Sequence, residues 1–303
     1  MTHKGLMVWL DSRIVRYEDA KVPILTHSMQ YGSGIFEGIR SYGTEDGTAV
    51  FRLRDHVRRF LNSARIYSMR LGHSQTQLEA AVKSVVKTNG LTDSYIRPFA
   101  FYNDDNIGIS TKGKRVSTYI AAIPFGAYFG KARETGLRCK VSSWHRINSE
   151  ILPVEAKASG NYVNSIIAGN EARNARFEEA ILTSIDGDIA EGPGENIFIV
   201  RDGALITPAI DSDILVGITR DTVIRIAEMT GMEVEQRLVK RDELYSADEI
   251  FFTGTAAEVT PIINVDGIRV GRGPGRTTRA LARQYSDIVH GKVPEFSGWL
   301  SYV

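Results

Sequence analysis

The chain has 303 residues, more than one hydrophobic core usually covers, so two domains are expected. Its net charge of +1 argues against bulk attraction to nucleic acid or to an anionic membrane, and neither partner is predicted. A single cysteine, Cys139, rules out an internal disulfide framework and favours a reducing, cytoplasmic compartment. No secretion signal is expected, because 1–13 lacks an apolar stretch, and the most apolar run, 119–130, is too short to cross a bilayer.

The first part of the chain mixes helix and strand patterns. An apolar repeat over 57–64 predicts a helix that Asp55 caps, and Arg59 lies on the face opposite that repeat. A second apolar repeat over 78–85 predicts another helix, which Gly90 is suited to end.

Two strands are expected next. The segment 94–102 alternates in polarity and places Tyr95 and Arg97 on one side of a strand, and 117–123 is apolar enough to be a central strand. The stretch 124–134 is rich in glycine and aromatic residues without a clear period, and it is interpreted as the boundary between domains.

The second part of the chain again contains both kinds of element. Strands are expected around 137–142, 180–184, 196–200 and 249–252, and helices over about 160–175 and from Thr219 to just before Gly231. Because regular strand–helix–strand alternation is missing, the fold class is predicted to be α+β.

Of three glycine-containing segments, two have the chemistry of an anion-binding site. Gly217 and Ile218 precede the helix at Thr219, whose first N–H groups and hydroxyl are suited to a phosphate. The strand-end turn 253–256 has similar potential, although each segment taken alone is more often a simple cap or turn. The segment 271–276 lacks the ending of a nucleotide-binding loop and is interpreted as a flexible surface loop.

Single residues carry little information by themselves. Lys157 stands between small residues just before a helix, and Tyr162 follows five residues later, but most lysines are solvated and most tyrosines are packing residues. Glu191 and Glu195 flank a Gly-Pro-Gly turn, where carboxylates are usually solvated. The six histidines show no metal-ligand spacing, so no metal site is predicted, and no Gly-x-Ser-x-Gly elbow of a serine hydrolase is present.

Five spaced segments occur along the chain in this order: Tyr31–Arg40 (YGSGIFEGIR), Glu155–Tyr162 (EAKASGNY), Ala190–Phe198 (AEGPGENIF), Gly217–Arg220 (GITR) and Gly254–Glu258 (GTAAE). Taken together, they resemble the branched-chain aminotransferases of class IV, and the resemblance extends over about 9–299. The resemblance implies the two-domain fold-type IV architecture of enzymes that use pyridoxal 5′-phosphate (PLP). It implies a small N-terminal α/β sandwich domain (1–123), an interdomain loop (124–134) and a large C-terminal PLP-binding domain with a mixed, barrel-like sheet (135–303).

The resemblance also assigns the cofactor residues. Lys157 is implied to be the catalytic residue, which binds PLP covalently and moves the substrate proton. Glu191 is implied to pair with the pyridinium nitrogen, and Tyr162 to bind the 3′ oxygen of the ring. The phosphate is implied to be held by four residues: Arg59, Ile218, Thr219 and Thr255.

The implied reaction is the reversible transfer of an amino group between leucine, isoleucine or valine and 2-oxoglutarate, giving glutamate. The implied substrate-binding residues are Tyr31, Phe36, Gly38, Arg40, Tyr95, Arg97, Ile109, Phe125, Tyr128, Thr255 and Ala256. Tyr31 and Ile109 are expected from a neighbouring subunit of a homodimer or of a larger assembly such as a hexamer. Phe125 stands where several relatives have tryptophan, which affects the expected side-chain preference and not the chemistry.

Three alternatives stay open at this point. A D-amino-acid aminotransferase and an aminodeoxychorismate lyase share the same fold, and a PLP-binding protein without catalysis is a third possibility. The segment 36–40 and the pair Tyr95 and Arg97 favour the branched-chain type over the first two. The joint presence of four residues, Lys157, Tyr162, Glu191 and Thr219, argues against a protein that only binds PLP.

Overall fold

Two eight-stranded sheets organise residues 3–105 and 107–303, which the computed structural model describes. The chain divides into two compact units, each built on one sheet. Unit 1 combines the N-terminal part through Gly126 with Ala156–Gly160 and Ile288–Val303, and unit 2 combines Ala127–Glu155 with Asn161–Asp287. The predicted boundary, 124–134, contains the junction between Gly126 and Ala127. The segments 156–160 and 288–303, however, pack with unit 1 instead of with the rest of 135–303.

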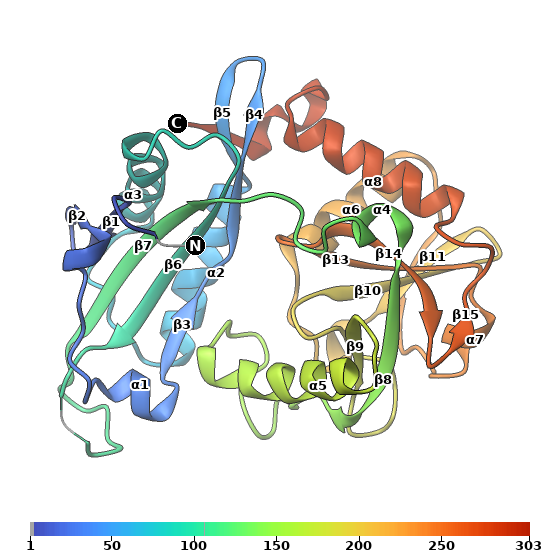
Figure 1. The fold of residues 1–303 in the computed structure, drawn as a ribbon, viewed down its shortest axis with the longest axis horizontal. Coiled ribbons are helices and arrows are strands. Elements are labelled where there is room, and N and C mark those ends of the chain that lie inside the picture. Colours follow the sequence, from blue (N-terminus) through green and yellow to red (C-terminus); the bar gives the residue numbers. More distant parts are fainter. Residues whose placement is uncertain (1–2, 106) are drawn as a thin grey trace. The chain divides into compact units, whose positions relative to one another are not determined.

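The sheet of unit 1 is antiparallel and has helices on one face. In spatial order its main strands are β16 (Leu300–Tyr302), β5 (Gly47–Phe51), β4 (Ile39–Thr44), β6 (Ser94–Tyr102), β7 (Val116–Pro124), β1 (Met7–Leu10) and β2 (Arg13–Arg16), and β3 (Gly34–Phe36) pairs with β6. Helices α2 (Leu53–Ile66) and α3 (Gln75–Thr88) pack together beside β6 and β7 (Figure 1). Their apolar residues and those of β6 form one core, so the other face of the sheet carries Tyr95, Arg97 and Phe99.

Helix α2 begins differently from the prediction. The expected cap, Asp55, lies inside α2, which starts at Leu53 after Arg52 in a left-handed conformation. The carboxylate of Asp55 instead accepts hydrogen bonds from Arg52 Nε at 2.6 Å and from Arg58 Nη2 at 2.7 Å. A local ion pair therefore replaces the expected cap. Helix α3 has a capping box, in which Ser74 is the cap.

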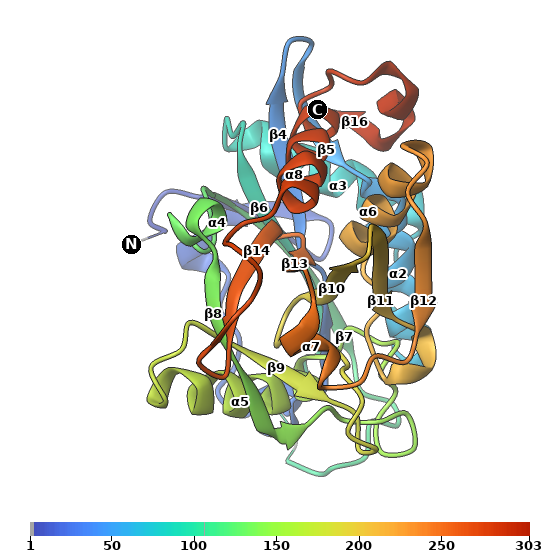
Figure 2. The ribbon, with the colours of Figure 1, turned by 90° about the vertical axis from the view of Figure 1, so that its right-hand side faces the viewer.

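The sheet of unit 2 is mixed. Its main strands, in spatial order, are β12 (Val234–Arg237), β11 (Ala204–Pro208), β10 (Asn196–Arg201), β13 (Glu249–Gly254), β14 (Glu258–Val265), β8 (Leu137–His145) and β9 (Glu179–Thr183), and β15 (Ile268–Arg269) pairs with β14. Strands β8 and β9 run parallel, whereas β10, β13 and β14 form antiparallel pairs (Figure 2). Together with unit 1, this mixture confirms the α+β prediction.

Helices pack on several strands of this second sheet. Helix α5 (Tyr162–Asn174) packs on β8 and β9, and α6 (Ile218–Met229) packs on β12 and β13. Helix α6 begins one residue earlier than expected, with Gly217 as its cap. In the part of the chain that the structure describes, no helix is long and apolar enough to span a membrane.

Helix α8 (Arg276–Val289) follows the glycine-rich segment 271–276. The carboxylate of Glu249 accepts hydrogen bonds from the backbone N–H groups of Thr277 and Thr278 at 2.9 and 2.7 Å, and from the Thr278 hydroxyl at 2.6 Å. A Cβ at Gly275 would lie 1.9 Å from Glu249 Cδ, so only glycine fits there. A protein carboxylate thus occupies the helix end that an anion would need, in agreement with the interpretation that 271–276 is not a phosphate loop.

Candidate active site

Lys157 is partly buried and is fixed through its own backbone. Its N–H donates to Ser63 Oγ at 3.0 Å, and its carbonyl accepts from the N–H of Phe36 at 2.9 Å. Its Nζ lies 5.0 Å from the centre of the Phe36 ring. Burial, and next the nearby charge of Arg59, lower the pKa of Lys157 to about 8. An amine with a lowered pKa is neutral more often and is therefore a better nucleophile and proton acceptor than an ordinary lysine.

Four further predicted residues continue from Phe36 on the same side of the sheet of unit 1. The guanidinium carbon of Arg97 lies 4.6 Å from the Phe36 ring centre, and Arg97 Nη2 donates to the hydroxyl of Tyr95 at 3.0 Å. The Tyr95 ring packs on Phe125 at 5.1 Å, and Arg40 lies over Phe125 at 5.2 Å. The result is a row of aromatic rings with two guanidinium groups, which suits a substrate that has both apolar and carboxylate parts.

Gly38 lies against the side chain of Tyr95. A Cβ at this position would lie 2.1 Å from the hydroxyl of Tyr95. Any larger residue would displace Tyr95 and, through it, the hydrogen bond from Arg97. The role of Gly38 is therefore to leave space for the phenol.

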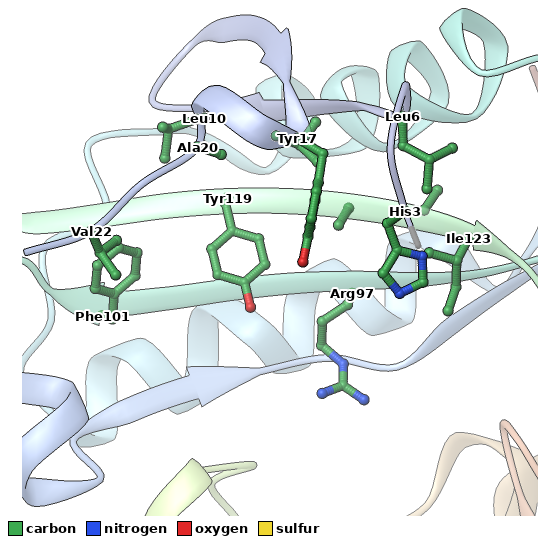
Figure 3. A pocket seen from close by; sticks show the side chains of 13 residues that line it. His3, Leu6, Leu10, Tyr17, Ala20, Val22, Arg97, Phe101, Tyr119 and Ile123 are labelled. Atoms are coloured by element: carbon green, nitrogen blue, oxygen red, sulfur yellow. The ribbon is translucent and has the colours of Figure 1, made fainter. Parts of the chain in front are cut away.

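A cavity of about 370 Å³ opens on the same face of unit 1. Its walls are mostly apolar, and Arg97 is the predicted site residue that lines it (Figure 3). The rings of Tyr17 and Tyr119 stand beside Arg97, with their hydroxyl groups toward the same side as the guanidinium. These polar groups of the cavity therefore lie on the same side as Arg97.

Arg59 pairs with Glu37, a residue of the segment 36–40 to which the sequence analysis assigned no individual role. Arg59 Nε and Nη2 donate to the two carboxylate oxygens of Glu37 at 2.6 and 2.9 Å. His56 Nδ1 lies 2.7 Å from Glu37 Oε2. Glu37 is fully buried, and its burial raises its pKa, but the Arg59 charge and the His56 hydrogen bond outweigh this, and the pKa lies well below its usual value.

In unit 2, Glu191 is buried and held by several donors. Its carboxylate accepts from Arg146 Nε at 2.6 Å, from Asn196 Nδ2 at 3.1 Å and from the N–H of Leu215 at 3.1 Å. Asn196 also donates to the carbonyl of Leu215 at 2.9 Å. These contacts fix the orientation of the carboxylate directly before the Gly-Pro-Gly turn.

The same asparagine links Glu191 to the start of α6. A Cβ at Gly217 would lie 2.0 Å from Asn196 Oδ1, so glycine is required where the helix begins. Ile218 and Thr219 form the buried first turn of α6, and the first N–H groups of a helix are anion donors. Thr255 and Ala256 lie in the turn between β13 and β14, and Tyr162 is the first residue of α5.

Three further predicted substrate residues are placed by other contacts. Tyr31, which is exposed, donates from its hydroxyl to the carbonyl of Ile107, and the carbonyl of Ile109 lies 3.1 Å from His27 Nε2. Ile109 is 78% exposed, although it is apolar. Tyr128 belongs to unit 2, where its ring packs on Phe129.

Four residues of these sites were missed from the sequence: Glu37, His56, Arg146 and Asn196. The sequence offered one signal for the first pair. His56 and Arg59 are three residues apart on a helix and so share a face, to which an acidic partner is expected. Arg146 directly follows β8 and carries no comparable pattern, because its contact with Glu191 is long-range. Among the described residues, no group of histidines, cysteines and carboxylates has the arrangement of a metal site.

Comparison with known proteins identifies the family to which this chain belongs. The amino-transferase class IV family matches residues 34–265. The branched-chain-amino-acid aminotransferase of Escherichia coli (strain K12) is 42% identical over 100% of this chain and 99% of its own length.

Solved structures are similar over nearly the whole chain. The branched-chain aminotransferase from Thermoproteus uzoniensis, solved with norvaline, is 46% identical with a TM-score of 0.94 and 98% of each chain covered. A second branched-chain aminotransferase, complexed with N-(5′-phosphopyridoxyl)-L-glutamate, is 42% identical with a TM-score of 0.95 and 99% of each chain covered. The chain therefore belongs to the class IV aminotransferases and, within them, to the branched-chain-amino-acid aminotransferases.

Proposed function

We propose that this enzyme transfers the amino group of leucine, isoleucine or valine to 2-oxoglutarate, reversibly, with PLP as cofactor. The observation that carries the proposal is the amine of Lys157, partly buried against Phe36 with a pKa lowered to about 8. The curated relatives have this activity in their names, and a solved relative holds a phosphopyridoxyl–glutamate adduct.

The residues present match the parts of PLP. Lys157 offers an amine to its aldehyde, and the buried, oriented carboxylate of Glu191 suits its pyridinium nitrogen. The helix start at Ile218 and Thr219, which Gly217 allows to approach closely, suits its phosphate. Arg59 and Thr255 complete the proposed phosphate site, and Tyr162 is proposed to bind the 3′ oxygen.

PLP supplies an electron sink for the substrate's Cα, and the protein supplies binding, orientation and proton transfer. Nζ of Lys157 would take the proton from Cα and deliver it to the carbon of PLP that retains the amino group, and the lowered pKa of Lys157 favours this proton transfer near neutral pH. Glu191 holds a proton at the ring nitrogen through its fixed carboxylate.

We assign substrate binding to the predicted residues. Phe36, Gly38 and Phe125 provide apolar contact or space for a branched side chain, and Tyr95, with Thr255 and Ala256, binds the α-carboxylate. Arg40 and Arg97 bind the distal carboxylate of glutamate, with Tyr31 and Tyr128 as further partners. Tyr31 and the exposed Ile109 are proposed to act in the site of a second copy within a homodimer or larger assembly, and the proposed compartment is the cytoplasm.

The central claim is tested by replacing Lys157 with alanine. Purified protein is mixed with leucine and 2-oxoglutarate, and glutamate is assayed along with the visible absorbance of bound PLP. We expect the wild type to form glutamate and Lys157→Ala to form none and to lack the absorbance band of lysine-bound PLP. A variant that is active and retains that band would contradict the assignment of Lys157. Repeating the assay with D-amino acids, and with aminodeoxychorismate for release of pyruvate, separates the two related activities.

A further inference from the structure

Glu37 has an environment that packing alone does not require. It is an acidic residue in the loop between β3 and β4, and its side chain is fully buried. A carboxylate is costly to remove from water unless charged or polar donors compensate for the loss. Even a well-paired buried ion pair is often no more stable than apolar residues of the same volume, so its presence calls for another explanation.

The compensating donors come from one face of α2. His56 and Arg59 are three residues apart and converge on the two oxygens of Glu37, with three contacts between 2.6 and 2.9 Å. Burial lowers the pKa of His56, and the hydrogen bond to Glu37 offsets this only in part. His56 is therefore neutral, and since Glu37 is ionised, the histidine proton is on Nδ1 and is donated to Glu37.

Lys157 is attached to the same two elements. Ser63, four residues after Arg59 on α2, accepts the hydrogen bond from the Lys157 N–H. Phe36, the neighbour of Glu37, donates its own N–H to the Lys157 carbonyl. The Glu37 N–H in turn donates to the carbonyl of Pro98 on β6, at 2.9 Å. The backbones that carry the amine and the carboxylate are thus fixed relative to each other.

We propose that Glu37 is a positioning residue of the active site, whose buried carboxylate fixes the guanidinium of Arg59 and sets the electrostatic field at the amine of Lys157. The charged and titratable groups that act on Lys157 are Arg59 and His56 from α2, Glu37 from the loop before β4, and Tyr95 and Arg97 from β6. The charges of Arg59, Arg97 and Glu37 shift the pKa of Lys157 in different directions. Arg59 and Arg97 lower the pKa of Lys157, whereas Glu37 raises it. Glu37 therefore offsets part of the effect of the cation that it holds in place.

The inference rests on the proposed roles of Lys157 and Arg59, but its test does not need the cofactor. Cofactor-free protein is treated with trace acetic anhydride across a range of pH, and acetylation of Lys157 is quantified by peptide mass spectrometry. We expect Lys157 to be half-reactive near pH 8 in the wild type. In Glu37→Gln the loss of the negative charge should lower this midpoint by about one pH unit, and Glu37→Asp, which keeps the charge, should restore most of it.

The matched control is Asp55→Asn, which removes a carboxylate on α2 that pairs with two arginines, Arg52 and Arg58. We expect its Lys157 midpoint to equal that of the wild type. A Glu37→Gln midpoint at or above the wild-type value, or an equal shift in Asp55→Asn, would overturn the proposal. A merely structural role would lower the thermal midpoint of Glu37→Gln without moving the Lys157 titration.

A second measurement needs no substitution and applies even if Glu37→Gln does not fold. Nitrogen-15 NMR of histidine-labelled wild type reports the protonation of each ring. We expect His56 to carry its proton on Nδ1 and to become cationic only at a lower pH than an ordinary histidine does. A His56 whose pKa is at or above the ordinary value, or that carries its proton on Nε2, would contradict the proposed arrangement. Failure of PLP to bind, with both results as expected, would instead count against the proposed function alone.

Discussion

At the scale of single residues, the two groups proposed to act on PLP, Lys157 and Glu191, are each controlled by partners that lie far away in the sequence. Glu191 is oriented by Arg146, which is 45 residues earlier, and Lys157 is held by Ser63, which is 94 residues earlier. In both cases the partner determines what the group can do chemically. The lysine is neutral more often near neutral pH because it is partly buried near Arg59, and the carboxylate has one orientation because three donors fix it.

Glu191→Gln is expected to slow the reaction while leaving PLP bound. An amide is nearly the same size as a carboxylate but does not hold a proton at the ring nitrogen, so the ring would withdraw electrons less well. We expect the exchange of the Cα hydrogen of leucine for deuterium to fall about 100-fold or more. The control is Glu171→Gln, since Glu171 binds Ser142 and Ser143 away from Glu191. Exchange at the wild-type rate in Glu191→Gln would refute the assigned role.

The residue types of the site could be predicted from the sequence, but their supporting partners could not. The motif around Lys157, the turn after Glu191 and the helix start at Thr219 are local patterns, and each is visible in a single stretch of chain. The contact of Glu37 with Arg59 depends on the path of the chain between them. A sequence pattern within one helix indicates that a partner is needed there and does not identify it.

At the scale of elements, the periodicity of the sequence predicted where helices and strands lie better than it predicted the residues at which they begin and end. Strand β6 was expected at 94–102 and is found there, because an alternating pattern on a sheet with one buried face leaves little freedom of register. The predicted start of α2 was wrong, because the side chain of Asp55 pairs with arginines instead of with the helix end. Helix α8 was not predicted, and its cap, Glu249, is 27 residues before the first helical residue.

Glu249→Gln tests the importance of this distant cap. The glutamine keeps an acceptor oxygen but loses the charge that favours a helix N-terminus, and one of its two groups becomes a donor facing N–H donors. We expect the free energy of unfolding to fall by about 1 kcal/mol, measured by urea denaturation. Glu228→Gln makes the same change at an exposed position of α6 and should alter stability by less than about 0.5 kcal/mol. Equal effects of the two substitutions would show that Glu249 is not a significant cap.

At the scale of the whole molecule, the length of the chain predicted two domains, but the sequence did not indicate how the chain passes between them. The chain passes from one unit to the other at four places, near 126, 155, 160 and 287. The short return at 156–160 carries Lys157, so the lysine proposed to be catalytic belongs by its contacts to unit 1, although it lies between two segments of unit 2 in the sequence. Such a return has no signature in composition or periodicity because it involves only a few residues.

The C-terminal strand provides a test at this scale. Strand β16 pairs with β5, and the carbonyl of Trp299 just before it accepts from the N–H of Arg52 at 2.7 Å. Removal of Leu300–Val303 should lower the free energy of unfolding by about 2–3 kcal/mol, because several strand hydrogen bonds of about 1 kcal/mol each are lost. The measurement is urea denaturation, with limited proteolysis to locate new cleavage sites. Unchanged stability, or cleavage confined to unit 2, would contradict this view of β16.

The position of β16 also has a consequence for how the protein is made. A ribosome that has synthesised β5 must add about 250 more residues before β16 exists, which takes roughly 10–50 seconds at the usual rates of translation. During that time the edge of β5 has unpaired backbone groups, which is the condition in which nascent chains associate wrongly. The N-terminal half of this enzyme is thus among the first parts to be synthesised and among the last to be completed.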